Sequence, residues 1–227
     1  MKDIIKIENL RRVFKSGEAE IIAVNDLSFS VPEGQFLAIT GKSGSGKSTL
    51  LYQLGLLDHP TSGSITIAGI PVEKLRSDER TQFRLNFLGY VFQDYAVLPS
   101  LTAEENVMLP LLMQGTSFLK AKEMADSALQ KVGLAHRKEN TPSQLSGGEQ
   151  QRVSIARAIV HNPKILFADE PTANLDTETS RSILSAFLEL NKQGQTIIMV
   201  THEEEYARLA HRIINLADGK IIKDTNL

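Results

Sequence analysis

The stretch FLAITGKSGSGKST, residues 36–49, decides the fold of this chain. It joins a short apolar run to a glycine-rich loop, and the loop opens into the helical pattern KSTLLYQLGLL. A strand, a loop and a helix in this order, with Gly41, Gly46, Lys47 and Ser48 at these spacings, are typical of a loop that surrounds phosphate groups. Glycines let backbone amides turn inward, the lysine neutralises phosphate oxygens, and the serine hydroxyl can ligate magnesium. A plain glycine turn at a helix start is the structural alternative.

Two further apolar runs also end in polar residues suited to chemistry. Residues 165–168 lead into Asp169 and Glu170, and residues 197–201 lead into His202. Short apolar runs rich in β-branched residues are typical of strands buried in a parallel sheet. Because the carboxyl ends of such strands share one edge, we expect both ends to meet the glycine-rich loop in one crevice.

The rest of the chain predicts two additions to this sheet. Residues 4–7, 23–31 and 64–69 have the pattern of short strands, broken by turns at 32–34 and 61–63, and we expect them to form an antiparallel layer. After Gln93 the strand signals stop, and helical patterns cover residues 103–113, 120–132 and 149–160. Pro110 is expected to kink or end the first of these helices.

The predicted fold class is therefore α/β, with a mostly parallel core sheet flanked by helices, an N-terminal antiparallel β layer and a helical subdomain. At 227 residues the chain is long enough for one large domain. We expect residues 1–93 and 163–227 to form its catalytic core and residues 94–162 to form the helical subdomain.

Composition excludes several classes of function. The chain has 25 Lys and Arg against 27 Asp and Glu, so it lacks the basic excess that attracts nucleic acid. It has no cysteine, which excludes disulfides and thiolate metal sites. It has neither a secretory signal pattern at its start nor an apolar run of 18 residues. These features predict a cytoplasmic chain that does not itself cross a membrane.

The polar residues after the predicted strands each have a chemical and a structural interpretation. Asp169 can hold hydrated magnesium and Glu170 can orient or deprotonate water, although either could instead cap the next turn. Gln93 can touch a metal or its water, or lie on the surface. His202 can hydrogen-bond a phosphate, or fill a structural role. Phe14 can stack on a nucleobase or belong to the core.

The hexapeptide LSGGEQ, residues 145–150, predicts a second phosphate-binding surface. Two glycines after a serine let the backbone approach a phosphate, and the following segment has the pattern of a helix whose amino end would face that anion. Asp176, in the segment ANLD, is either a turn residue or a contact near the site. One compact domain rarely needs two phosphate surfaces for one nucleotide, so the surplus needs an explanation.

Taken in order, these motifs closely resemble those of the ATP-binding subunits of ATP-binding-cassette (ABC) transporters, over essentially the whole chain. GKSGSGKST resembles the Walker A loop of that family, and LSGGEQ resembles its signature. ILFADE is similar to its Walker B motif, with Glu170 as the catalytic carboxylate. The resemblance also makes Gln93 the Q-loop residue, Asp176 the D-loop residue and His202 the switch histidine.

The resemblance implies an ATPase that uses ATP and Mg²⁺. Its catalytic residues would be Glu170, His202, Lys47 and Gln93. Magnesium would be held by Ser48, Gln93 and Asp169. The nucleotide would be contacted by Phe14, Gly41, Lys42, Ser43, Gly44, Ser45, Gly46, Lys47, Ser48, Thr49, Gln93, Asp176 and His202.

In this family two cassettes pair head to tail, which would explain the second phosphate surface. Ser146, Gly147 and Gly148 of one copy would then act on the ATP that the other copy holds. ATP would close the dimer, and release of the products would open it. The implied partners are a second copy of the chain and integral membrane permease subunits that dock near Gln93 and the helical subdomain.

A narrower likeness lies in LGLLDHPTSG and in the segment around Gln93. These stretches resemble lipoprotein-releasing (LolD-like) and macrolide-efflux (MacB-like) ATPases, with cell-division (FtsE-like) ATPases nearby. They imply lipoprotein release or export of amphipathic substrates from the cytoplasmic face of the inner membrane, or alternatively a mechanical role in a cell-division complex. Phe14 stands where the family more often has tyrosine, Lys42 where it has proline, and Glu203 where it has aspartate.

Overall fold

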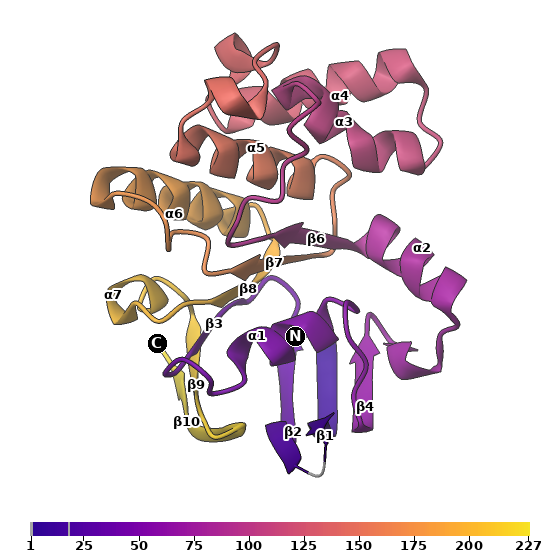
Figure 1. Ribbon diagram of the computed structural model, residues 1–227, viewed down its shortest axis with the longest axis vertical. Helices are drawn as coiled ribbons and strands as arrows, with labels where there is room; N and C mark the ends of the chain where they lie inside the picture. The colour runs from indigo at the N-terminus through magenta and orange to yellow at the C-terminus, as the bar shows by residue number, and fades with distance from the viewer. Residues whose placement is uncertain (1, 18) are drawn as a thin grey trace. The chain divides into compact units, whose positions relative to one another are not determined.

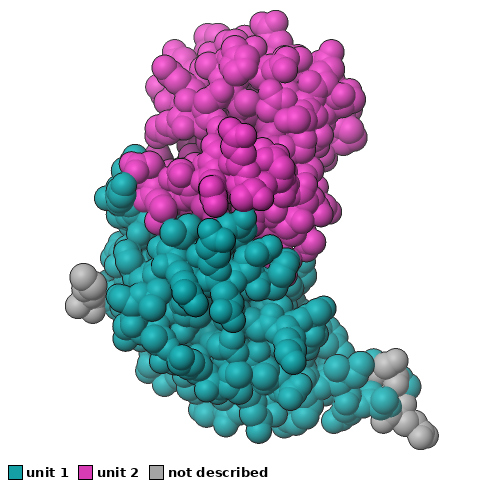
Figure 2. Space-filling view, turned by 90° about the vertical axis from the view of Figure 1, so that its left-hand side faces the viewer, with its two compact units in different colours: residues 1–82, 191–227 teal, residues 83–190 magenta. Residues whose placement is uncertain are grey.

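The computed structural model describes residues 2–17 and 19–227 of the chain. These residues form two compact units, coloured separately in Figure 2. Unit 1 comprises the chain up to Gln82 together with Asn191–Leu227, and unit 2 comprises Phe83–Leu190. Strands and helices alternate along the chain (Figure 1), which confirms the predicted α/β class.

Unit 1 contains the predicted antiparallel layer, in the strand order β2-β1-β4-β5. Its strands are β1 (Asp3–Ser16), β2 (Ala19–Pro32), β4 (Ser62–Ile67) and β5 (Ile70–Pro71). The layer is confirmed, but its first two strands are much longer than the sequence pattern indicates. Their outer halves alternate poorly because the pairing of β1 with β2 shifts register at several points.

The turn predicted at residues 61–63 is wrong in its second half, because β4 already begins at Ser62. Ser62 pairs with Arg11 across a register shift in β1. Gly63 has a φ of 87°, and a Cβ there would meet the backbone of Asn9 and Leu10. Glycine at this position thus lets the strand continue through a bulge instead of turning.

The apolar runs at residues 36–40 and 197–200 form neighbouring parallel strands of unit 1. The strands are β3 (Phe36–Thr40), β8 (Thr196–Val200), β9 (Arg212–Ala217) and β10 (Lys220–Asn226). β3 pairs in parallel with β8 on one side and β9 on the other, while β10 is antiparallel to β9. Every residue of β3 and β8 is buried, and the carboxyl ends of these two strands lie at the same edge.

Three short helical segments complete unit 1, and a fourth helix contributes residues to both units. They are α1 (Lys47–Leu54), η1 (Val72–Lys74), α7 (Glu204–Ala207) and α2 (Ser77–Phe87). α1 buries its leucines and ends at Gly55, so it is three residues shorter than the predicted helix. Gly55 ends it because glycine is a poor helix former.

Unit 2 pairs β6 (Leu88–Val91) in parallel with β7 (Ile165–Asp169). Its helices are α3 (Ala103–Met113), α4 (Phe118–Lys131), α5 (Gly147–Ile159) and α6 (Thr177–Lys192), with 3₁₀ turns η2 (Ala135–Arg137) and η3 (Pro142–Gln144). Between residues 94 and 162, all of them described, the regular structure is helical. The three helices predicted there are present, each within two residues of its predicted bounds.

Of the two alternatives expected for Pro110, that it ends its helix is wrong, because α3 continues to Met113, and that it kinks the helix stays a prediction. Its amino end is fixed by a capping box, in which Thr102 and Glu105 each bond to the backbone of the other. Val107, Met108 and Leu111 are buried around the proline. This packing holds the helix although proline provides no backbone donor.

Among the described residues, no helix is both long and apolar enough to cross a membrane.

Candidate functional site

The loop between β3 and α1 is shaped by three glycines with positive φ. The angles are 147° at Gly41, 79° at Gly44 and 98° at Gly46, which L side chains rarely adopt. A Cβ at Gly41 would meet the carbonyl oxygen of Leu216, and one at Gly46 would meet that of Ala23. At Gly44 no described atom lies within 4 Å of the Cβ position. The loop is therefore packed tightly at both ends and open in its middle.

Lys47 is buried inside this loop, with 6% of its surface exposed. Its Nζ donates to the carbonyl oxygens of Gly41 at 2.9 Å and Lys42 at 3.0 Å. A buried ammonium is costly unless it is well bonded, and here the backbone of the loop itself provides the acceptors. Phosphate oxygens would be stronger, charge-assisted partners for the same group. The lysine is thus held where the sequence predicts an anion.

Helix α1 begins at Lys47 with the features of an anion-binding helix end. Gly46 at the N-cap provides no side-chain oxygen, and the first turn contains no acidic residue. The positive end of the helix dipole therefore faces neither a side-chain cap nor a carboxylate of its own first turn. The buried Oγ of Ser45 has no hydrogen-bond partner among the described residues. Taken with the glycine cradle, these groups fit a bound triphosphate.

His202 follows β8 and shares a pocket with the phosphate loop. The pocket has a volume of about 810 Å³ and is lined by Thr40, Gly41, Lys42, Ser43, Gly44, Ser45, His202, Glu204, Asn215, Leu216, Ala217, Asp218 and Ile222. The histidine is half exposed, and its Nε2 lies 3.8 Å from Oε1 of Glu203. Within unit 1, the structure therefore brings two of the three predicted strand ends together. The lining of this pocket does not include Phe14.

The acidic pair follows β7 in unit 2. Asp169 is the last residue of the strand and is 4% exposed. Glu170 has a φ of 43°, a left-handed conformation that a glutamate adopts only at a cost. Its carbonyl oxygen accepts from the amide of Ala173 at 3.1 Å, which closes a turn. The strained turn directs the chain away from the strand immediately after the two carboxylates.

Gln93 lies in a segment that other parts of unit 2 hold in place. Its carbonyl oxygen accepts from Nδ2 of Asn174 at 3.4 Å. Tyr95 and Ala96 both have positive φ, 61° and 49°. The guanidinium of Arg157, on α5, donates to the carbonyl oxygens of Ala96 at 2.7 Å and Tyr95 at 3.2 Å. Burial lowers the pKa of Arg157 below its ordinary value.

The predicted second phosphate surface is the amino end of α5. Ser146 is its N-cap, and Oγ of Ser146 accepts from the amide of Glu149 at 3.3 Å. The Glu149 carboxylate accepts from the amide of Ser146 at 2.8 Å and from Arg137 at 3.0 Å. This reciprocal pair is a capping box. The sequence therefore specifies a helix start here, as predicted, and the glutamate of LSGGEQ has a structural role.

The two glycines of the hexapeptide also lie close to side chains of unit 2. A Cβ at Gly147 would lie 2.8 Å from the Tyr95 hydroxyl oxygen. A Cβ at Gly148 would meet Cγ2 of Thr179 on α6. Close approach to a phosphate was the reason given for these glycines from sequence, and the structure adds contacts inside the same chain. The hexapeptide is thus packed against the segment after Gln93 and against α6.

Asp176 caps the amino end of α6. Its Oδ1 accepts from the amides of Glu178 and Thr179, both at 3.0 Å, and its Oδ2 accepts from Oγ1 of Thr179 at 2.6 Å. The hydrogen bond from the Thr179 hydroxyl is the main cause that lowers the pKa of this carboxyl. Asp176 therefore has the structural role that was one of its two interpretations, and its role in nucleotide contact stays a prediction.

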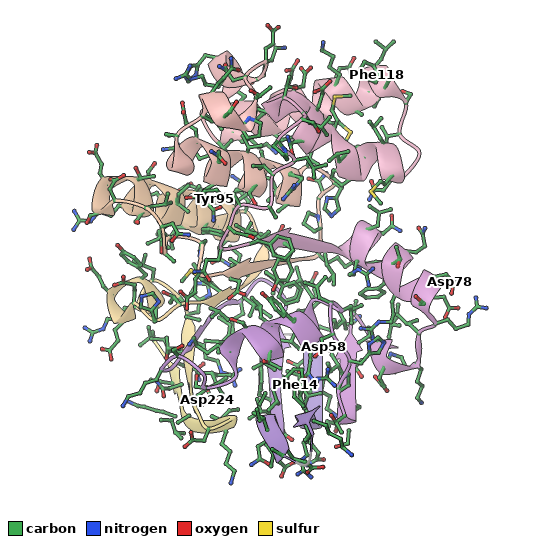
Figure 3. All side chains as sticks on the ribbon, in the orientation of Figure 1. Phe14, Asp58, Asp78, Tyr95, Phe118 and Asp224 are labelled. Carbon is green, nitrogen blue, oxygen red and sulfur yellow. The ribbon has the colours of Figure 1, made fainter. Side chains whose placement is uncertain are left out.

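Phe14 lies near the end of β1, on the antiparallel sheet (Figure 3), and 40% of its surface is exposed. It is not an ordinary core phenylalanine. The guanidinium carbon of Arg12 lies 4.4 Å from the centroid of its ring. An exposed ring of this kind can accept a stacked nucleobase on its free side.

Three residues of this arrangement were missed by sequence reasoning. Arg12 had a signal, because residues two apart in a strand share a face. Thr179 also had one, because an aspartate followed by a hydroxyl three residues later is a capping pattern. Arg157 had none, since it lies 61 and 62 residues from its two carbonyl acceptors.

The capping box at Ser146 predicts a pH-dependent contribution to stability. The amide of Ser146 is the main cause that lowers the pKa of Glu149 below its ordinary 4.5, and Arg137 adds to it. A lowered folded-state pKa means that the ionised carboxylate stabilises the fold fully above about pH 4.5, and that this contribution is lost as the pH falls through the lowered value.

We therefore expect Glu149→Gln to reduce the free energy of unfolding by about 0.5–1 kcal/mol at pH 7. The difference in the free energy of unfolding from the unmodified chain should shrink in urea titrations as the pH is lowered below 4.5. Glu123→Gln on α4, whose exposed carboxylate pairs with Lys120 three residues away, should change the free energy of unfolding at pH 7 by less than Glu149→Gln does. If the difference in the free energy of unfolding between Glu149→Gln and the unmodified chain stayed constant with pH, the stabilising role of the ionised Glu149 carboxylate would be contradicted.

The fold and the phosphate loop define a phosphate-loop nucleoside triphosphatase. Comparisons with known proteins make the class more specific. The family model described as "ABC transporter" matches residues 24–173. The chain therefore belongs to the ABC transporter family, and it is an ATPase cassette of that family.

Individual relatives agree with this assignment. The chain is 45% identical to the lipoprotein-releasing system ATP-binding protein LolD of Aquifex aeolicus, over 98% of this chain and 97% of LolD. It is 44% identical to the macrolide export ATP-binding/permease protein MacB of Burkholderia pseudomallei, over 97% of this chain. It spans only 34% of MacB, about a third of that longer protein. A dimeric structure of the ATP-binding cassette MJ0796, bound to ADP and Pi, matches with a TM-score of 0.92 and 40% identity over 98% of both chains.

Proposed function

We propose that this chain is the ATP-hydrolysing subunit of a membrane transporter, in which two copies pair head to tail around ATP. The observation that carries this proposal is that two separate helices of one chain begin at closely packed glycines, α1 in unit 1 and α5 in unit 2. Unit 1 has the glycine cradle with buried Lys47 before α1, and unit 2 has the glycines after Ser146 at the start of α5. The dimeric structure of MJ0796 supports pairing of such cassettes.

Within this proposal, the loop of unit 1 binds the triphosphate. The backbone amides of residues 41–49 and Nζ of Lys47 receive the β- and γ-phosphate oxygens. His202 donates a hydrogen bond to the γ-phosphate from the rim of the same pocket. The open Cβ position of Gly44 supports this assignment, because backbone can approach the phosphates there without a side chain in the way.

Magnesium is proposed to be held by Ser48, Asp169 and Gln93. A hydroxyl, a buried carboxylate and an amide oxygen are the hard ligands that this cation takes. The buried position of Asp169 at the end of β7 fits a carboxylate that serves a cation. Bound there, magnesium would neutralise charge on the β- and γ-phosphate oxygens.

Glu170 is proposed as the general base. Its carboxylate oxygen accepts a proton from the attacking water while its side chain orients that water. Its strained backbone supports a functional role, because left-handed glutamates are costly and persist where the surroundings impose them. Ser146, Gly147 and Gly148 are proposed to contact the γ-phosphate held by the other copy, and Asp176 to lie beside that contact.

The membrane partner is proposed to be a permease that docks on the helices of unit 2, at the cytoplasmic face of the membrane. Most apolar side chains of α3 up to Leu111 are buried, whereas Leu98, which lies before the helix, is exposed. A more exposed set of apolar side chains lies at the end of α3 and the start of α4, where Phe118 is labelled in Figure 3. It consists of Leu112, Met113, Phe118 and Leu119. Exposed apolar patches of this kind are typical of interaction sites.

The cargo class is proposed as lipoproteins or other amphipathic molecules. The support is the relatives themselves, since LolD belongs to a lipoprotein-releasing system and MacB is named for macrolide export. A mechanical role in a membrane complex without transport is the alternative that the motifs leave open. Identification of the permease that co-purifies with the chain separates the two.

The docking proposal is tested by changing Phe118 and Leu119 to aspartate together. These side chains are 62% and 77% exposed, so the fold should tolerate the change. We expect the variant to bind ATP normally but to lose its membrane partner when purified from native membranes. Leu209→Asp, an exposed leucine of unit 1, is the matched control and should keep the partner. Retention of the partner by the double variant would contradict the docking surface.

A further inference from the structure

Phe14 is covered on one side by a positively charged side chain that is itself firmly held. The Arg12 guanidinium lies over the ring, 4.4 Å from its centroid, and the ring remains 40% exposed. A cation over an aromatic face is attracted by the electron density of the ring. One face of the ring is therefore covered by a cation, while part of the ring stays exposed. We infer that Arg12 is a positioning residue that holds Phe14 ready to stack on the base of the nucleotide, and that Asp58 fixes Arg12 for this task.

The contact between Arg12 and Asp58 restricts the position of the guanidinium. Nη2 of Arg12 lies 2.9 Å from Oδ1 of Asp58, and Nε lies 2.8 Å from Oδ2. Both side chains are about three-quarters buried. The hydrogen bond from Nη2 and the ion-pair contact at Nε together restrict where the guanidinium can lie.

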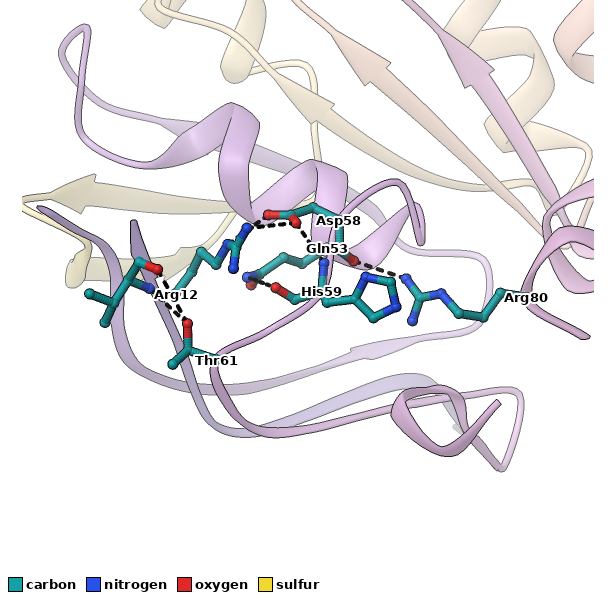
Figure 4. Close-up of polar contacts among 7 residues, drawn as sticks. Arg12, Gln53, Asp58, His59, Thr61 and Arg80 are labelled. Atoms are coloured by element: carbon teal, nitrogen blue, oxygen red, sulfur yellow. Dashed lines mark hydrogen bonds and ion pairs between the residues drawn. The ribbon is translucent and has the colours of Figure 1, made fainter. Parts of the chain in front are cut away.

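Asp58 is held in turn by its own loop (Figure 4). The amide of His59 donates to Oδ1 of Asp58 at 2.7 Å. Arg80, 4% exposed, donates to the carbonyl oxygens of Leu56 at 3.2 Å and Asp58 at 2.9 Å. The buried guanidinium of Arg80 therefore anchors the backbone on which the Asp58 carboxylate is carried.

The loop and the strand are also tied together beside this pair. The amide of Val13 donates to Oγ1 of Thr61 at 3.0 Å, and the amide of Thr61 donates to the carbonyl oxygen of Arg11 at 2.8 Å. Asp58 follows α1 by four residues, and α1 begins at the phosphate loop. One short helix thus carries the phosphate-binding loop at its start and the anchor of the aromatic ring after its end.

The register of the sheet places Phe14 within reach of a nucleotide bound at that loop. Phe14 pairs with Ile21 on β2, and the carbonyl oxygen of Ala23 on the same strand abuts Gly46. Two residues of a strand span about 7 Å, a distance that a ribose can bridge. The base of a nucleotide held at the loop would therefore lie over Phe14. Holding the ring in one orientation lowers the entropic cost of stacking.

This inference rests on the proposed function, and a double-mutant cycle tests it separately. The variants are Arg12→Ala, Phe14→Ala and both together, and the readouts are the Kd for Mg²⁺-ATP and for Mg²⁺-triphosphate, which has no base. We expect Phe14→Ala to raise the Kd for ATP about tenfold, as loss of a stacked base does. Arg12→Ala should raise it about three- to fivefold, which is the size of an exposed cation–π contact.

The decisive result is the double variant. If Arg12 acts through Phe14, the double variant should bind ATP like Phe14→Ala alone, and the Kd for triphosphate should stay unchanged in all three. Independent, multiplicative effects on ATP, or an equal loss of triphosphate affinity, would overturn the inference. Failure of the unmodified chain to bind ATP would instead refute the proposed function.

Two further variants distinguish a positioning role of Arg12 from a purely structural one. Asp58→Asn removes the charge pair with Arg12 and keeps the size of the side chain, so it should weaken ATP binding in the same direction while sparing triphosphate. Arg11→Ala, at the exposed neighbour of Arg12 in β1, should leave the Kd for both ligands unchanged. Equal ATP affinity in Asp58→Asn and the unmodified chain would show that Asp58 does not fix Arg12.

Discussion

Changing Lys47 to alanine is expected to raise the Kd for ATP by about 100-fold or more, because it removes the buried cation of the phosphate loop. Nζ of Lys47 bonds only to backbone carbonyls of Gly41 and Lys42 in the described structure. Each charge-assisted hydrogen bond to a phosphate oxygen contributes about 1.5–3 kcal/mol, so two of them correspond to a loss of that size. Equilibrium binding of a fluorescent ATP analogue measures it.

The control for this variant is Lys74→Ala, an exposed lysine of the 3₁₀ turn η1 in the same unit. It should change neither the Kd nor the melting temperature measurably. Lys47→Ala also leaves two loop carbonyls without their donor, so thermal unfolding must be measured beside binding. A folded Lys47→Ala chain that binds ATP as tightly as the unmodified chain would disprove the phosphate-loop assignment.

Changing Glu170 to glutamine is expected to lower kcat for ATP hydrolysis by about 100-fold or more while ATP still binds. Glutamine keeps the size of the side chain, and it tolerates the left-handed backbone at this position about as well as glutamate. It cannot accept the proton of the attacking water. Since hydrolysis opens the proposed dimer, the variant should accumulate as an ATP-bound dimer in size-exclusion chromatography.

Glu123→Gln, an exposed carboxylate of α4 in the same unit, is the control and should keep full turnover. Phosphate release gives kcat, and the binding assay gives the Kd. A Glu170→Gln chain that hydrolyses ATP at the original rate would remove Glu170 from the chemistry. One that stays monomeric in saturating ATP would contradict the proposed coupling between ATP and pairing.

The parts of the fold that could be predicted from sequence are those with strong local signals. The fully buried strands β3, β7 and β8 were located within one residue because each is a short, β-branched apolar run. The helices after Gln93 were found by their helical pattern. The long strands β1 and β2 were underpredicted, since bulges interrupt the pairing between them.

The candidate site divides in the same way. The phosphate loop is encoded locally, because glycines and one lysine at fixed spacing determine its shape and charge. The contacts of Tyr95 with Gly147 and of Arg157 with the segment after Gln93 join residues far apart in sequence. No local pattern specifies them. Asp176 shows a further limit of prediction from sequence. An aspartate at this position can cap a helix or contact a nucleotide, and the sequence does not distinguish these two roles.

The central claim is that the signature of one copy serves the ATP of another. The most direct test measures ATP-driven pairing by size-exclusion chromatography, with every chain carrying Glu170→Gln to prevent hydrolysis. Chains with Lys47→Ala are mixed with chains carrying Ser146→Arg. In a shared site, such a mixed pair has one intact combination of loop and signature, whereas either variant alone has none.

The reciprocal mixture is the control: a chain carrying both changes is combined with a chain carrying neither. A shared site leaves this mixed pair without an intact combination, whereas a site within one chain leaves it one. We expect ATP-dependent dimers of mixed composition in the first mixture and none of mixed composition in the second. Mixed dimers in the second and none in the first would contradict the account.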